Sequence, residues 1–147
     1  MIVSIHDLLD IMEEKFNQNG EVVLKVSGNS MLPFFRDQET EVVLVKAKHP
    51  LKRADIIFYK HNGNWILHRL LRNKGKTLKV CGDALTKIEI VESSSVLAVV
   101  KRYRNKNHEV DVKSFSYRFK VFLWMLLRPI RKILLRIYHF WNKRGKK

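Results

Sequence analysis

One segment decides how this chain is interpreted: Val26-Ser27-Gly28-Asn29-Ser30-Met31-Leu32-Pro33. It follows an apolar, strand-like run, and its glycine and proline are typical of a tight turn. A serine held in such a turn, directly after a strand, is presented as a nucleophile must be. Ser30 is therefore the first candidate for chemistry.

Three later blocks strengthen this interpretation: Ala54-Asp55-Ile56-Ile57, Leu67-His68-Arg69 and Cys81-Gly82-Asp83. Each lies at the edge of a strand-like segment. Together with Ser30 they offer a nucleophile, a base and an orienting carboxylate, which is the set of groups that serine peptidases use.

The four blocks resemble the serine peptidases of the type I signal peptidase and SOS-repressor superfamily, over about residues 22–103. The pattern of that superfamily is roughly G-x-S-M-x-P, then G-D-I, then a base followed by Arg, then G-D. Bacterial-type members use Lys as the base. His68 stands at that position here, as in the endoplasmic-reticulum and archaeal branch. Histidine titrates near neutrality, whereas a lysine base needs its pKa lowered strongly by burial.

The resemblance implies a role for each of these residues. Ser30 is the nucleophile, His68 is the general base, and Asp83 orients the imidazole. The backbone N–H groups of Asn29 and Ser30 would stabilise the oxyanion. Glu89 remains an alternative carboxylate, because the second Asp that the His-base branch usually has after the G-D block is absent.

A substrate would bind as an extended strand along residues 21–26, with Val22, Leu24 and Val26 as the substrate-binding residues. The resemblance implies cleavage of an exported or membrane-associated peptide or preprotein. No cofactor is needed. No metal site is expected either, because Cys81 is the single cysteine and no clustered ligand spacing occurs.

Each of these residues also has a plainer interpretation. Ser30 could be a turn or cap serine, His68 an exposed strand histidine, and Asp83 a turn aspartate after Gly82. The order and spacing of the blocks favour the catalytic interpretation.

The predicted fold class is mainly β: a coiled antiparallel sheet with a short N-terminal helix and a basic amphipathic helical tail. Residues 4–17 form the predicted helix, with Ser4 as its cap. The predicted strands are residues 21–26, 41–46, 56–59, 65–71, 77–81, 96–103 and 109–112. The predicted units are 1–20, 21–112 and 113–147.

Charge is concentrated in the tail. The chain of 147 residues has 29 Lys and Arg against 14 Asp and Glu, and residues 112–147 contain 11 of the basic residues and no acidic one. Such a tail favours an anionic partner, either a membrane surface or nucleic acid.

The tail pattern favours the membrane. Beyond Pro129, which should break the helix, basic residues follow one helical face and apolar residues the other. The basic residues are Arg128, which directly precedes Pro129, and Arg131, Lys132, Arg136, His139 and Lys143; the apolar ones are Ile130, Ile133, Leu134, Ile137, Tyr138 and Trp141. This predicts peripheral, monotopic association through an interfacial helix, on a side of the membrane that the sequence leaves open. No run of about 18 uncharged apolar residues predicts a spanning helix.

Two alternatives to a peptidase remain. The first is a self-processing or non-catalytic regulator of the same fold. It is disfavoured because the 20 residues before the first strand are too few for a helix-turn-helix domain. The second is a basic nucleic-acid-binding module, which the long apolar face of the tail makes unlikely. The packing of Tyr117, Phe119, Phe122 and Trp124 onto the β-domain is also open. The sequence carries no signal for an oligomeric state.

Overall fold

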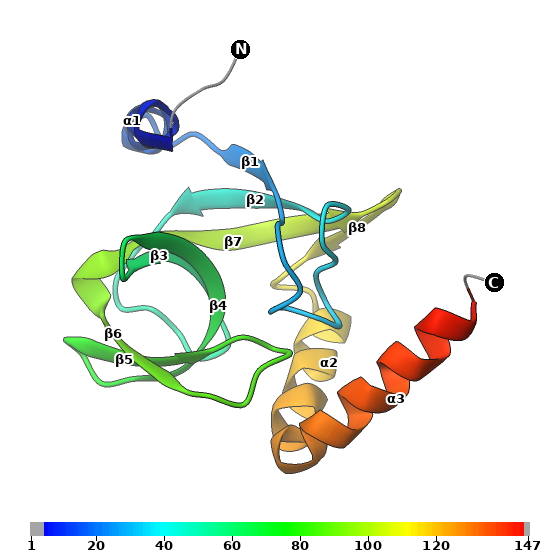
Figure 1. The fold of residues 1–147 in the computed structure, drawn as a ribbon. Helices are drawn as coiled ribbons and strands as arrows, with labels where there is room; N and C mark the ends of the chain where they lie inside the picture. The colour runs from blue at the N-terminus through cyan, green and yellow to red at the C-terminus, as the bar shows by residue number, and fades with distance from the viewer. Residues whose placement is uncertain (1–4, 146–147) are drawn as a thin grey trace.

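The computed structural model describes residues 5–145, and its centre is one curled antiparallel sheet (Figure 1). Its strands are β1 Val22–Lys25, β2 Glu41–Lys46, β3 Ile56–His61, β4 Asn64–Asn73, β5 Thr77–Cys81, β6 Glu89–Glu92, β7 Val96–Asn105 and β8 His108–Asp111. The order is β1-β2-β7-β3-β4-β5-β6, with β8 added to β7. The sheet does not close, because β1 and β6 lie at its two ends. The predicted fold class is confirmed.

Turn chemistry sets the register of the hairpins. β3 and β4 are joined by Asn62-Gly63, and both residues have positive φ, 50° and 78°. A two-residue hairpin turn of this kind needs positive φ at both positions, which Asn-Gly tolerates best. The resulting register pairs Ile57 with His68, so the turn fixes where His68 lies on the sheet.

Three α-helices accompany the sheet: α1 Ile5–Asn17, α2 Phe115–Leu126 and α3 Arg131–Arg144. A 3₁₀ turn, Arg128–Ile130, separates α2 from α3, so the predicted break at Pro129 is confirmed. The expected cap Ser4 precedes the described residues. Within residues 5–145, no helix is long and apolar enough to cross a membrane.

The core has two parts. One cluster lies between Leu51, Tyr59, Leu70 and Val80 of the curled β3–β5 region. The other combines β2, β3 and β7 with the helices. Its members include Met12 and Phe16 from α1, Phe35, Val42, Leu44, Phe58 and Tyr103, and Tyr117 and Val121 from α2. α2 is therefore part of the folded core.

The C-terminal segment contacts the β-domain through Trp124 and Arg131. Arg131, expected on the exposed basic face, is 1% exposed. Its guanidinium lies 5.3 Å from the Trp124 ring centroid and donates to the Leu85 carbonyl. Trp124 donates its indole N–H to the Asp83 carbonyl. Tyr117 and Trp124 thus pack onto the β-domain, whereas Phe119 and Phe122 are exposed.

This packing predicts different outcomes for two truncations. Removing residues 113–147 takes Tyr117 and Val121 out of the core. The free energy of unfolding should fall by about 1.5–3 kcal/mol for each buried side chain that is lost. The total free energy of unfolding of a domain is only about 5–15 kcal/mol, so the truncated protein should be molten or insoluble. Removing residues 137–147 keeps the buried Arg131 and Leu135 and should leave thermal unfolding, followed by circular dichroism, nearly unchanged. A folded, soluble 1–112 fragment would contradict the account.

Candidate active site

Ser30 lies in a loop that the core holds at both sides. Met31 and Phe35 are buried at 1% and 0% exposure, whereas Ser30 itself is half-buried. Gly28 has φ of +90° and donates its N–H to Asp37 Oδ1 at 2.8 Å. That φ favours glycine, so the Gly in the motif is required by the turn. The Ser30 carbonyl accepts from the Ala84 N–H at 2.9 Å, which ties this loop to the segment after β5.

His68 is a buried residue in the middle of β4, 5% exposed. Burial lowers its pKa from the ordinary histidine value, because desolvation disfavours the charged imidazolium. The charges of Glu89 and Asp83 act in the opposite direction. The ring is therefore held in its neutral form at neutral pH, as a general base must be.

Gly82 brings His68 and Ser30 together. A Cβ atom at this position would lie 2.5 Å from the Ser30 carbonyl oxygen and 3.1 Å from His68 Nε2. Both groups therefore border the space that a side chain at position 82 would occupy, so only glycine fits there. No hydrogen bond joins Ser30 Oγ to His68 Nε2 within the described chain. Such bonds are often long in a free enzyme and tighten when substrate binds.

The other nitrogen of His68 is held by Tyr59. The Tyr59 hydroxyl lies 3.0 Å from His68 Nδ1 and donates to Glu89 Oε2 at 3.3 Å. Burial and the charge of Glu89 raise the pKa of Tyr59, so its hydroxyl keeps its proton. Because the Tyr59 hydroxyl points its hydrogen at Glu89, its oxygen accepts from His68 Nδ1–H. This tautomer leaves the lone pair on Nε2, the nitrogen that lies beside Gly82.

Asp83 does not contact His68 in this structure. Both of its oxygens accept from Arg69: Oδ1 from Nε at 2.7 Å and Oδ2 from Nη2 at 2.6 Å. Asp83 is therefore ion-paired with Arg69, and the carboxylate recorded beside the imidazole is that of Glu89, with Oε2 4.0 Å from Nδ1. Glu89 was the alternative that the sequence left open.

The alternation of side chains along a strand explains why Glu89 lies beside His68 and Asp83 lies beside Arg69. Successive side chains of a strand point to opposite faces, so His68 and Arg69 face opposite sides of the sheet. Cys81 is the register partner of Arg69, and Asp83 follows it by two residues. On the other face, Leu70 pairs with Val80 and Val80 with Glu89, which places Glu89 with His68.

Arg69 organises the buried side of the site. It is fully buried, and besides Asp83 it donates to the Ala54 carbonyl and to the Tyr117 hydroxyl. Its guanidinium lies 5.2 Å from the Phe34 ring centroid. Burial alone would lower the pKa of Arg69, but the adjacent Asp83 raises it overall. Arg69 thus joins β4, the Ser30 loop and α2, as expected of a structural residue.

The backbone N–H groups of Asn29 and Ser30 donate no hydrogen bond to any described residue. Val22 and Val26 belong to the core cluster and Leu24 packs against it. Their side chains are therefore core residues, and a substrate could use only the backbone edge of β1. Among the described residues, no group of three His, Cys, Asp or Glu side chains could hold a metal ion.

The sequence interpretation missed Tyr59 because it treated residues 56–59 only as a strand. Alternation would have found it: His68 pairs with Ile57, so Tyr59 lies two residues along on the same face. It also missed β6, the strand that begins at Glu89.

A family match shows which proteins this chain is related to. No curated protein matches the chain. The model of the Peptidase S24-like family matches residues 2–83, which is more than half of the chain and contains the Ser30 loop, His68 and Gly82. The chain belongs to the Peptidase S24-like family.

Proposed function

We propose that this protein is a serine endopeptidase with a Ser30–His68 dyad. One observation carries the proposal: His68 Nε2 and the Ser30 carbonyl oxygen both lie beside Gly82, while the Tyr59 hydroxyl hydrogen-bonds His68 Nδ1. A buried neutral imidazole, fixed at Nδ1 and open at Nε2 toward a loop serine, is the arrangement that activates a hydroxyl.

The reaction follows from these positions. His68 Nε2 takes the Ser30 proton as Oγ attacks the peptide carbonyl. The N–H groups of Asn29 and Ser30 donate to the resulting oxyanion. The imidazolium then protonates the leaving amine, and water releases the acyl group in a second, equivalent step. Glu89 stabilises the imidazolium through Tyr59.

The substrate binds along the free edge of β1, which pairs only with β2 among the described strands. β1 ends at Lys25, five residues before Ser30, so a strand added there would carry its scissile bond to the loop. The substrate class, an exported or membrane-associated peptide, follows from the resemblance to signal peptidases.

Peripheral binding to an anionic membrane is part of this proposal. On α3, Ile133, Ile137 and Trp141 are 59%, 49% and 72% exposed. Lys132 and Arg136 are exposed on the same helix. Apolar side chains that insert at the acyl boundary, together with cations near anionic head groups, give interfacial binding.

The pH dependence tests the dyad. A base works only when neutral, so kcat/KM should rise with pH, and the pKa of His68 is lowered from 6.5, so the midpoint should lie below 6.5. The charge of Glu89 raises that pKa, so Glu89→Gln should move the midpoint to lower pH. A midpoint above pH 9 would instead indicate a lysine base.

Tyr59→Phe tests the positioning of the imidazole. It removes both hydrogen bonds of the Tyr59 hydroxyl. The bond to His68 is worth about 1 kcal/mol, so kcat should fall about fivefold and the midpoint should move. Tyr138→Phe, a matched change on α3, should alter neither. An unchanged rate and pH profile in Tyr59→Phe would show that Tyr59 is only a core residue.

A further inference from the structure

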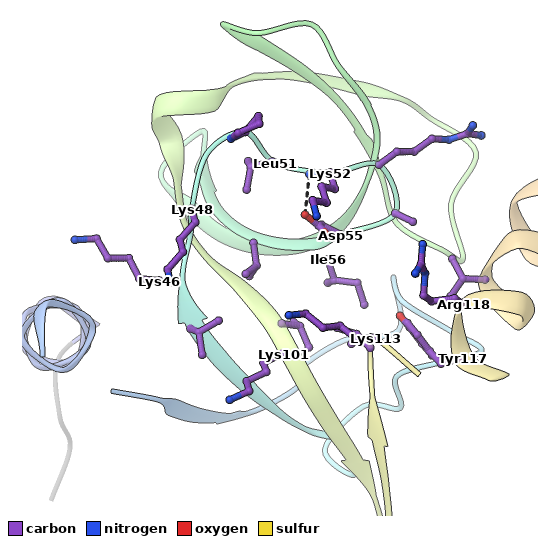
Figure 2. Close-up of a pocket in the computed structure, with 18 of the residues that line it drawn as sticks. Lys46, Lys48, Leu51, Lys52, Asp55, Ile56, Lys101, Lys113, Tyr117 and Arg118 are labelled. Atoms are coloured by element: carbon purple, nitrogen blue, oxygen red, sulfur yellow. Dashed lines mark hydrogen bonds between the residues drawn. The ribbon is translucent and has the colours of Figure 1, made fainter. Parts of the chain in front are cut away.

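A cavity of about 1000 Å³ lies away from the Ser30 site, between the sheet and α2 (Figure 2). Its walls come from β2, the segment after it, β7 and α2. None of Ser30, His68, Tyr59 or Glu89 lines it. The volume reaches the upper end of the range for small-molecule sites, about 300–1,000 Å³.

The floor of the cavity is apolar. Ile56, Val100 and Val121 are buried core residues, and Leu51 is 4% exposed. Val45, Val99, Val112 and Met125 are further apolar residues of the lining. A floor of aliphatic carbon with few polar groups favours a hydrocarbon chain.

The rim carries one sign of charge. Seven basic residues line the cavity: Lys46, Lys48, Lys52, Arg53, Lys101, Lys113 and Arg118. Figure 2 shows labelled members of this set surrounding Leu51 and Ile56. Lys101 is paired with Glu21, and Lys46 donates to Asn17. The side chains of the other five make no hydrogen bond or ion pair with the described residues.

Asp55 is the single carboxylate of the lining. Its Oδ2 already accepts from the Lys52 N–H at 2.8 Å, and burial raises its pKa. One carboxylate faces seven basic residues, so the rim keeps an excess of positive charge. Phe122 and Leu126, 57% and 60% exposed, line the mouth. Leu123, Ile130 and Ile133 are also exposed, at 42%, 46% and 59%.

We propose that this cavity binds one anionic phospholipid, with an acyl chain on the apolar floor and the head group among the rim cations. Charge complementarity excludes a neutral or cationic ligand, and the apolar floor excludes nucleic acid. The exposed apolar residues Phe122 and Leu126 in the lining favour a lipid that comes from a membrane. This inference goes beyond the proposed peptidase activity.

Binding of monomeric lysophosphatidylglycerol, below its micelle concentration, tests the proposal by calorimetry. Lys113→Gln with Arg118→Gln should weaken binding at least about tenfold, since each cation near an anionic head group contributes measurably. Lys74→Gln with Lys76→Gln has the same net charge but changes the β4–β5 turn, and it should bind like the unmodified protein. Equal loss in both variants would overturn the proposal.

The apolar floor is tested separately. Val45→Phe fills part of the cavity and should weaken lipid binding, whereas Val23→Phe on the exposed face of β1 should not. Circular dichroism verifies that each variant is folded. Undiminished binding in a folded Val45→Phe protein would show that no acyl chain enters the cavity.

Four further ligands identify what is recognised. Lysophosphatidylcholine should bind much more weakly, and inorganic phosphate alone should not bind measurably. Equal affinity for either would overturn the proposal. If oleate binds and lysophosphatidylglycerol does not, the phospholipid assignment is overturned. If polyglutamate binds more tightly than lysophosphatidylglycerol, the cavity rim is an acidic-peptide surface and the proposal is overturned. Because the readout needs no proteolysis, its failure and failure of the peptidase proposal are distinguishable.

Discussion

Replacing Ser30 with alanine is expected to abolish peptide cleavage and leave the fold unchanged. The substitution removes the attacking oxygen and little volume from a half-buried position, while the buried Met31 and Phe35 still hold the loop. A fall in kcat of roughly 10⁴-fold or more is expected for loss of a nucleophile. Cleavage products of an extended peptide pool, quantified by mass spectrometry, measure it.

His68→Ala should be nearly as damaging as Ser30→Ala, and the double variant little worse than either, because groups that act as a unit are non-additive. Ser27→Ala, an exposed serine in the same loop, is the matched control and should cut normally. Independent, multiplicative losses from Ser30 and His68 would argue against a dyad.

Asp83→Ala should destabilise the protein by about 3–5 kcal/mol, the effect of leaving a buried charge without its partner. Arg69 is fully buried and both of its bonds to Asp83 would be lost. Urea unfolding at neutral pH measures the loss. The exposed Asp10→Ala on α1 should unfold like the original protein.

The same variant separates two roles for Asp83. Ion pairing predicts a large loss of stability, which Arg69→Met with Asp83→Leu should partly restore, since apolar pairs can replace buried ion pairs. An orienting carboxylate would instead cost activity with stability intact. A folded, fully stable but inactive Asp83→Ala protein would contradict the assignment made here.

Most of the sheet could be predicted from sequence. Residues 41–46 and 77–81 are strands with the predicted bounds, because β-branched residues there are bounded by turn residues. β6 escaped prediction because its four residues, two of them glutamates, carry little strand signal by themselves. Pairing with β5, a tertiary interaction, makes this segment a strand.

The sequence predicts those parts of the site in which the motif determines the local backbone. It does not predict side-chain contacts between different strands. Gly28 and Gly82 are required by a positive φ and by a close approach, both local demands of the motif. The partners of His68 and Asp83 depend on which face of the sheet each side chain occupies. The motif itself does not specify the face on which each side chain lies. The register between β4 and β5 determines it.

Covalent labelling with a fluorophosphonate is the most direct test of the central claim, that Ser30 is a nucleophile activated by His68. It needs no known substrate, because the reagent reports only an activated hydroxyl. The account predicts one adduct, mapped to Ser30 by peptide mass spectrometry, that disappears in His68→Ala and persists in Asp10→Ala. No adduct on the folded protein, or labelling of Ser30 that is unaffected by loss of His68, would contradict it.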